Sequence, residues 1–372
     1  MHKKNQNDLE LLQICINLSK KNYTKTSPNP CVGCLIEKNG NILSTGSTSE
    51  GGRPHAEFNA FKKISNKSIV NGATLYVSLE PCSHYGQTPP CTDLIINNGI
   101  SRVVIAAIDS DKRMKGKSID ILRQNGIEVD VIEINEAYEA NKAFLKSKEL
   151  ERPYITLKIA SSLDGKIALS NGQSKWITGE KARKHGHYLR YINDAILIGK
   201  NTLLTDNPSL NCRIKGLEEN SPTKIILANK LDFDPSHKLL QNDTSTIIFY
   251  GDNDYNRDNI SKFRQNVRLF PSPTIESSID LRYCLQKLSE MSINSILIEG
   301  GSKIATAFLS QSLVDEIFWF KSSKIIGSDG KDAIGELGCT AMNDVIDNFQ
   351  LKEVRKIDKS DSLSIYESRS IL

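Results

Sequence analysis

Apolar and polar residues alternate with two distinct periods in the first part of the chain. Apolar residues recur at helical spacing over residues 9–20, which predicts an amphipathic helix. In residues 31–46, two apolar runs flank Asn39-Gly40, a pair typical of a tight β-hairpin turn. Short apolar runs then alternate with helical patterns, which predicts a layered α/β domain with a largely buried sheet. The expected strands are 73–82, 102–109 and 127–134, and the expected helices are 91–99, 119–126 and one that begins within 51–64 and ends near Asn66.

A second α/β region follows a charged, polar stretch at residues 146–153. A fresh apolar strand comes next, so we place a domain boundary here and expect domains over 1–147 and 148–372. The polar segment 242–259 is expected to be rich in loops around its single strand. Further strands are expected at 154–160, 195–199, 224–229, 245–251, 267–271 and 295–299, with two closing strands within 351–369.

Composition narrows the class of protein. The 372 residues include 48 basic and 44 acidic side chains, a net charge of +4 that gives no broad basic surface for nucleic acid or membrane. No apolar run approaches the ~18 residues of a membrane span, and the polar N-terminus does not resemble a signal peptide. Eight cysteines are too few for a disulfide scaffold, which indicates a reduced, cytoplasmic protein.

Three potential metal ligands each stand directly after a proline. They are His55, Cys82 and Cys91, and imidazole and thiolate groups are good zinc ligands. Three protein ligands leave one position for water, which is typical of catalytic rather than structural zinc. Glu57 lies two residues beyond His55, and both can face one metal if the helix begins between them. Glu57 would then move a proton from the activated water to a leaving group.

The order H-x-E, P-C and a further cysteine is the signature of zinc deaminases, in which water attacks an amidine carbon and ammonia leaves. Other ligand sets stay open on these residues alone. Cys31 and Cys34 form a C-x-x-C pair that could close a structural four-cysteine site with the two later cysteines. That set leaves the histidine and the glutamate without a role. His84 could also be a ligand, although we expect it to line the pocket.

Long motifs resemble one family in particular, the bifunctional riboflavin-biosynthesis deaminase–reductases (RibD). The first half carries "PNPCVG", "HAE" and "EPCSHYGQTPPC", the last with eight residues between its cysteines, in the family's order. The second half carries "LKIASSLDGKIA", "SKWITG", "GKNTLLTDNPSLNCR" and "LIEGG", also in order. The resemblance covers roughly residues 9–350.

This resemblance implies a cytidine-deaminase-like three-layer α/β domain followed by a dihydrofolate-reductase-like α/β domain. It implies one Zn²⁺ per chain and NADPH as cofactors, and a small phosphorylated pyrimidine as substrate. The first domain would deaminate 2,5-diamino-6-ribosylamino-4(3H)-pyrimidinone 5′-phosphate. The second would reduce the ribosyl group of the product, 5-amino-6-(5-phosphoribosylamino)uracil, to ribityl. Nucleic acid and membrane are not expected partners, and a homo-oligomer is left open.

Residue roles also follow from the resemblance. His55, Cys82 and Cys91 would bind zinc beside the catalytic Glu57, and Asn29 would hold the pyrimidine. In the second half, the residues expected to contact the dinucleotide are Ser161, Trp176, Thr202, Asp206, Gly301 and Ser302. Those expected to contact the substrate are Ser174, Arg190, Leu210, Arg213 and Glu299. Lys158 and Asp164 would polarise the sugar carbon, or would be a strand-edge charge and a turn residue.

One loop departs from the family pattern. Residues 109–118, "DSDKRMKGKS", lack the family's Pro-Asn-Pro element. Its four cations would meet a substrate phosphate or form a solvated loop; they are Lys112, Arg113, Lys115 and Lys117. Two rival functions remain: a nucleic-acid base deaminase with an accessory C-terminal domain, and a non-catalytic protein stabilised by zinc. The low aromatic content of 6% and the balanced charge disfavour the first.

Overall fold

The computed structural model of the chain describes residues 2–112, 114–241 and 245–369. It divides into two compact units, Met1–Glu151 and Arg152–Leu372. The sequence predicts a boundary after residue 147, but helix α6 (Lys142–Leu150) continues past that point. A charged, polar stretch is compatible with the exposed face of a helix as well as with a linker.

The first unit is built on a five-stranded sheet in the order β2-β1-β3-β4-β5. Strand β1 is antiparallel to its neighbours β2 and β3, whereas β3, β4 and β5 run parallel. Asn39 and Gly40 both have positive φ in the β1–β2 turn, so the expected hairpin is confirmed. The strands are β1 (Gly33–Lys38), β2 (Asn41–Ser47), β3 (Thr74–Val77), β4 (Arg102–Ile105) and β5 (Glu128–Val131).

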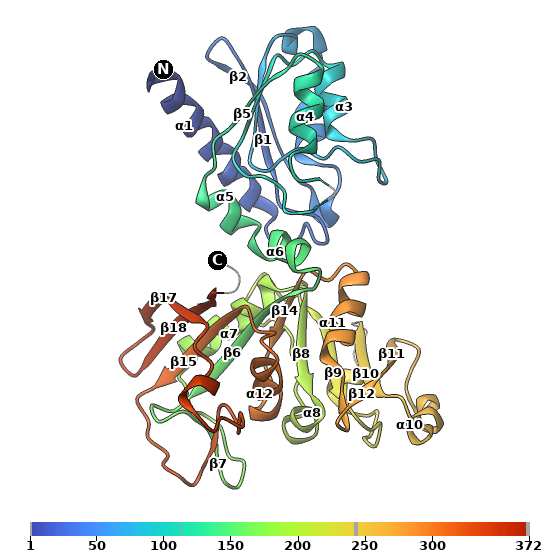
Figure 1. Cartoon of the computed structure of the whole chain (residues 1–372), viewed down its shortest axis with the longest axis vertical. Helices are drawn as coiled ribbons and strands as arrows, with labels where there is room; N and C mark the ends of the chain where they lie inside the picture. Colours follow the sequence, from blue (N-terminus) through green and yellow to red (C-terminus); the bar gives the residue numbers. More distant parts are fainter. Residues whose placement is uncertain (1, 113, 242–244, 370–372) are drawn as a thin grey trace. The chain divides into compact units, whose positions relative to one another are not determined.

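Helices cover both faces of this sheet and make three layers (Figure 1). Two glycines let the helices approach closely on opposite faces. A Cβ at Gly33 would collide with the Cys15 carbonyl of α1, and one at Gly46 would collide with the Ala56 carbonyl of α2. The helices are α1 (His2–Ser19), α2 (Ala56–Lys62), α3 (Cys91–Asn97), α4 (Lys117–Gln124) and α5 (Asn135–Ala140), together with α6.

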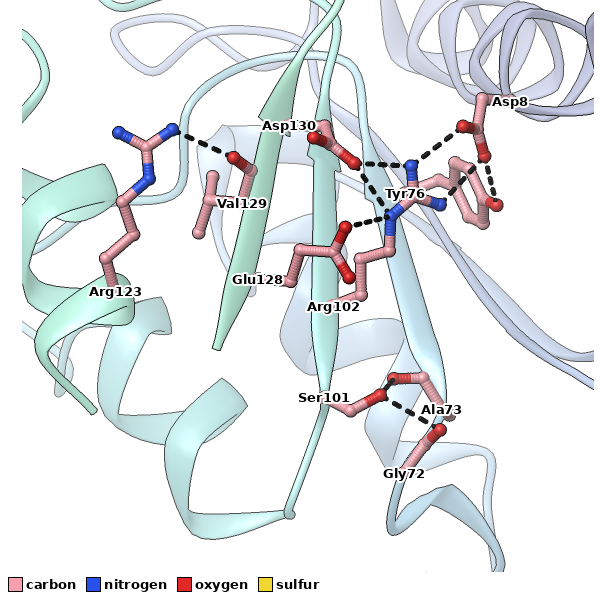
Figure 2. Close-up of polar contacts among 10 residues, drawn as sticks. All are labelled: Asp8, Gly72, Ala73, Tyr76, Ser101, Arg102, Arg123, Glu128, Val129 and Asp130. Atoms are coloured by element: carbon pink, nitrogen blue, oxygen red, sulfur yellow. Dashed lines mark hydrogen bonds and ion pairs between the residues drawn. The ribbon is translucent and has the colours of Figure 1, made fainter. Parts of the chain in front are cut away.

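A buried ionic network ties α1 to three strands (Figure 2). The Arg102 guanidinium donates from Nη1 and Nη2 to the two oxygens of Asp8, over 2.9 and 2.8 Å. Its Nε donates to Asp130 over 2.8 Å, and the Tyr76 hydroxyl donates to Asp8 over 2.7 Å. The Asp8 side chain is only 1% exposed and that of Arg102 only 9%. Both ions are thus withdrawn from water and depend on each other.

The second unit contains a nine-stranded sheet in the order β11-β10-β9-β8-β14-β6-β15-β18-β17. The strands from β11 to β15 are parallel, and β18 and β17 extend the sheet in antiparallel fashion. The expected closing strands are therefore confirmed. The strands are β6 (Tyr154–Ser161), β8 (Ala195–Gly199), β9 (Thr223–Ala228), β10 (Thr246–Gly251), β11 (Val267–Ser272), β14 (Ser295–Ile298), β15 (Glu316–Ser322), β17 (Phe349–Lys356) and β18 (Asp361–Ser368).

Two hydrophobic cores lie in this unit. One combines α11 and α12 with strand residues such as Leu157 and Leu197, and the other combines α7, α8 and α9 with Ile196 and Ile198. Neighbouring strand residues point to opposite faces, so the helices cover both sides of the sheet. The helices are α7 (Glu180–Ile192), α8 (Lys200–Asp206), α9 (Lys238–Gln241), α10 (Asp254–Asn259), α11 (Leu281–Glu290) and α12 (Ser302–Ser310), and two small ribbons pair β7 (Lys166–Leu169) with β16 (Gly330–Asp332) and β12 (Thr274–Ile275) with β13 (Ser278–Ile279).

Two local expectations were wrong. Helix α2 ends at Lys62 rather than near Asn66, and helix α10 occupies part of the polar segment that was expected to be rich in loops around its strand. Residues 242–244 of that segment lie outside the described residues. Across the part of the chain that the structure describes, no helix is long and apolar enough to cross a bilayer.

Candidate functional site

His55, Cys82 and Cys91 come together in the first unit. Their ligand atoms all lie within 4.8 Å of one another. His55 Nδ1 is 3.5 Å from each of the two sulfurs, and the Cys91 amide donates to the Cys82 sulfur over 3.3 Å. It is the one such group of His, Cys, Asp and Glu side chains among the described residues. One imidazole and two thiol groups suit zinc, so the donor set fits the metal that the resemblance implies.

Helix starts place these side chains. His55 has extended backbone at the N-cap of α2, and Glu57 lies in the first turn, so the two residues need not follow helical spacing. Cys91 is the first residue of α3, where the partial positive charge of the helix end favours an anionic ligand. Cys82 lies after β3, within hydrogen-bonding distance of both partners.

The two thiols differ in their acidity. A hydrogen bond from Cys91 lowers the pKa of the Cys82 thiol to about 4, and His55 acts in the same direction against the effect of burial. The same hydrogen bond, followed by burial, raises the pKa of Cys91 well above its usual value. A thiolate at Cys82 is the form that binds a metal ion.

Glu57 is a buried carboxyl group beside this cluster. Glu57 is only 3% exposed to solvent. Burial raises the pKa of Glu57, and the negative charge of Cys82 acts in the same direction, whereas His55 opposes both. A carboxyl group with a raised pKa is suited to accept and return a proton near neutral pH.

The other candidate residues of the first unit lie outside this cluster, and each of them contacts another part of the protein. Asn29 donates from Nδ2 to the Gly52 carbonyl over 2.9 Å. Cys31 donates to the Ala140 carbonyl, and Cys34 is fully buried in β1, so the four-cysteine alternative is not formed. His84 is outside the metal cluster, with Nδ1 3.0 Å from the sulfur of Met114.

A charged cluster forms in the second unit around Glu299, directly after β14. Its carboxylate accepts two hydrogen bonds from Arg190, over 2.7 Å from Nε and 3.0 Å from Nη2. Lys158 Nζ on β6 is 3.9 Å from the same carboxylate. Burial alone would raise the pKa of Glu299, but Arg190 and Lys158 outweigh it and hold this pKa at about 2. Glu299 therefore stays ionised at neutral pH.

Two further residues of this cluster were missed in the sequence. The Asn211 carbonyl accepts from Arg190 Nη1 over 3.1 Å and lies 3.2 Å from His187 Nδ1. Burial, followed by the Arg190 charge, lowers the pKa of His187. His187 is three residues before Arg190 in α7, so helical spacing was the signal that could have found it.

Three further residues of the second unit are candidates for contact with the substrate. Leu210 is buried and has a positive φ of 52°. Arg213 is exposed and donates to the Ser209 hydroxyl over 2.6 Å. Ser174 lies in an exposed turn, where its carbonyl accepts from the Ile177 amide. Among the described residues, no hydrogen bond or ion pair joins Ser174 to the Glu299 cluster.

The six dinucleotide candidates occupy several elements. Ser161 is fully buried at the end of β6, and its hydroxyl accepts from Trp319 Nε1 over 2.8 Å. Trp176 is 60% exposed and has the Arg183 guanidinium 4.2 Å from its ring centre. Thr202 and Asp206 belong to α8; Gly301 is the N-cap and Ser302 the first residue of α12. The strand, turn and helix expected at residues 295–309 are thus present.

Asp164 makes contacts typical of a turn residue. Its carboxylate accepts from the Ser162 hydroxyl and from the amides of Ile326 and Gly327. These hydrogen bonds, with the one from Ser162 strongest, hold the pKa of Asp164 at about 2. The contacts favour a structural role for Asp164, whereas Lys158 faces the charged cluster.

The cations of the atypical loop are exposed where the structure describes them. Lys112 pairs with Glu151 over 2.7 Å, and Lys115 and Lys117 are exposed. Arg113 lies outside the described residues.

Comparison with known proteins identifies both parts of the chain. Residues 5–107 match the cytidine and deoxycytidylate deaminase zinc-binding region, and residues 153–360 match the RibD C-terminal domain. The riboflavin biosynthesis protein RibD of Aquifex aeolicus is 39% identical over 91% of this chain and 92% of that protein. RibD of Escherichia coli is 34% identical over 92% of this chain and 94% of that protein.

Solved structures share the fold over nearly the whole chain. The diaminohydroxyphosphoribosylaminopyrimidine deaminase/5-amino-6-(5-phosphoribosylamino)uracil reductase of Thermotoga maritima has a TM-score of 0.82 at 34% identity, covering 96% of this chain and 97% of that chain. RibD of Acinetobacter baumannii has a TM-score of 0.85 at 32% identity, covering 98% and 99%. Fold and site therefore define a zinc-binding deaminase domain followed by a reductase domain. The chain belongs to the RibD family of riboflavin biosynthesis proteins and is a bifunctional deaminase and reductase, as the motifs predicted.

Replacing Glu299 by glutamine is expected to damage the reductase and spare the deaminase. The neutral amide would leave Arg190 and Lys158 without their shared counter-charge, and breaking one side of a buried ion pair costs ~3–5 kcal/mol. We expect the reductase kcat/KM to fall by at least ~100-fold, because each ~1.4 kcal/mol of lost interaction is tenfold in rate. Glu290→Gln, which breaks an exposed pair with Lys287, is the matched control. An equal effect of both variants would contradict the role of Glu299.

Proposed function

We propose that the first domain deaminates 2,5-diamino-6-ribosylamino-4(3H)-pyrimidinone 5′-phosphate and that the second reduces the ribosyl group of the resulting uracil with NADPH. The observation that carries the first step is the His55, Cys82 and Cys91 cluster with the buried Glu57 beside it. The solved Thermotoga maritima relative is named for these two reactions, which supports the same substrates here.

In the deaminase, His55, Cys82 and Cys91 would hold one zinc ion, which supplies Lewis-acid activation of water. Glu57 would take a proton from the attacking water at its carboxylate oxygen. It would return that proton to the exocyclic nitrogen, whose bond to the ring carbon breaks to release ammonia. Asn29 would hold the pyrimidine through its side-chain amide, which has both donor and acceptor atoms.

In the reductase, NADPH would supply the hydride that the ring-opened sugar accepts at C1′. The dinucleotide would bind along Ser161, Trp176, Thr202, Asp206 and the start of α12. Glu299 would fix the direction of Arg190 and Lys158, since its carboxylate contacts both cations. Arg213 is exposed and would bind the sugar phosphate through its planar guanidinium.

Removal of the metal tests whether the deaminase and the reductase use independent sites. Dialysis against a zinc chelator is expected to abolish ammonia release from the diaminopyrimidine phosphate and to leave NADPH oxidation on pre-deaminated substrate within about twofold, because the ligands lie in the first unit alone. Added zinc should restore ammonia release. Untreated, zinc-loaded protein that releases no ammonia would refute the deaminase proposal, and loss of both activities on chelation would refute independent sites.

A further inference from the structure

Glu80 is a buried carboxylate that collects four hydrogen bonds from one loop. The residue is 4% exposed and lies between β3 and Cys82. Its Oε2 accepts from the amides of Asp109 and Gly116, over 3.2 and 3.1 Å. Its Oε1 accepts from the amide and the hydroxyl of Ser118, over 3.3 and 2.8 Å. Both ends of the atypical loop 109–118 are therefore fixed to one side chain.

Three of the four donors belong to the N-terminal end of helix α4. Gly116 is the N-cap of α4 and Ser118 lies in its first turn, so the carboxylate faces the positive end of that helix. Hydrogen bonds to an ionised acceptor are about twice as strong as neutral ones. The loop thus has a strong internal anchor although it lacks the prolines expected at this position.

The anchored loop also contacts the segment between the two cysteine ligands. Met114, at the middle of the loop, is only 3% exposed. Its sulfur is 3.0 Å from His84 Nδ1 and 3.8 Å from the Ser83 hydroxyl, and both residues follow Cys82 directly. Contacts therefore connect Glu80, through the loop, to the segment between the metal ligands Cys82 and Cys91.

We propose that Glu80 is a positioning residue of the deaminase: it holds the described residues of the loop in place, with Met114 against Ser83 and His84, so that they and His84 form a fixed wall of the substrate pocket. The inference rests on the proposed deaminase function. Glu80 does not itself act on the reacting atoms. Its effect is on binding of the pyrimidine phosphate, because the wall exists before the substrate arrives.

Glu80→Gln is the informative variant. The amide oxygen can accept at one position, but the NH₂ group must then face either the amides of Asp109 and Gly116 or the amide of Ser118 at the other. We expect KM for the diaminopyrimidine phosphate to rise about tenfold or more, with kcat changed less than about threefold, since uniform binding is lost. Zinc content should stay at one ion per chain, and hydrogen exchange of the amides of residues 109–118 should accelerate. Ser118→Ala removes one of the four bonds and should give a smaller rise in KM in a fully folded protein.

Asp8→Asn is the matched control, because it alters another buried carboxylate of the same unit outside the loop. It should leave KM unchanged, and any faster amide exchange should extend over the whole unit rather than be confined to the loop. Unaltered KM in both Glu80→Gln and Ser118→Ala would overturn the inference, as would an equal rise in KM in Asp8→Asn, which would show a general effect of destabilisation. If zinc-loaded wild-type protein releases no ammonia, the proposed function fails and the inference fails with it.

Discussion

Glu57→Gln is expected to lower the rate of ammonia release by about 10²–10⁴-fold, the usual contribution of a general acid–base group. Glutamine keeps the size of the side chain but can neither accept nor return the proton. Because the metal ligands are His55, Cys82 and Cys91, the variant should retain zinc. The reductase should oxidise NADPH on pre-deaminated substrate at the wild-type rate, since its candidate residues belong to the other unit.

The measurements are ammonia release, zinc content and NADPH oxidation on the same protein sample. Glu50→Gln is the matched control, because Glu50 belongs to the same unit and pairs with Lys25 at the surface. It should leave all three quantities unchanged. Retained ammonia release in Glu57→Gln would remove Glu57 from the mechanism, and loss of zinc would assign it to metal binding instead.

Arg102→Ala is expected to destabilise the first unit by ~3–5 kcal/mol, which is the cost of breaking a buried ion pair from one side. Asp8 would stay buried without the guanidinium that now binds both of its oxygens. Denaturant-dependent hydrogen exchange of the β4 amides measures the change. Ammonia release should therefore be lost at lower denaturant concentrations than in the wild type.

Arg123→Ala is the control for Arg102→Ala, and both arginines are labelled in Figure 2. Arg123 is exposed and donates to the Val129 carbonyl, so its loss should cost at most about 1 kcal/mol. The double variant Asp8→Leu with Arg102→Met should recover much of the stability, because apolar side chains of similar size need no counter-charge. Equal destabilisation by Arg102→Ala and Arg123→Ala would contradict the importance of the buried network.

The metal cluster could be predicted because its geometry is largely local. His55 and Cys91 each stand at a helix start that a preceding proline marks in the sequence. The β1–β2 hairpin could be predicted equally well, since Asn39 and Gly40 specify the turn by themselves. In both cases the side chains that decide the structure lie within a few residues of one another.

Contacts between distant residues could not be predicted in this way. Glu80 binds partners 29 to 38 positions further along the chain, and Arg102 binds Asp8 across 94 positions. No periodicity marks either pairing. Helix α10 was missed for a different reason: its sequence is polar, and the one local signal was Asn253, whose side chain caps the helix by accepting from the Asn256 amide.

The chain has two tryptophans, Trp176 and Trp319, and both belong to the second unit. Intrinsic fluorescence excited at the indole band is therefore an optical reporter of the reductase domain alone. An emission-based melting curve would follow residues 152–372 and stay silent while the deaminase domain unfolds. A tryptophan introduced at exposed Phe58 would give the first unit a signal of its own.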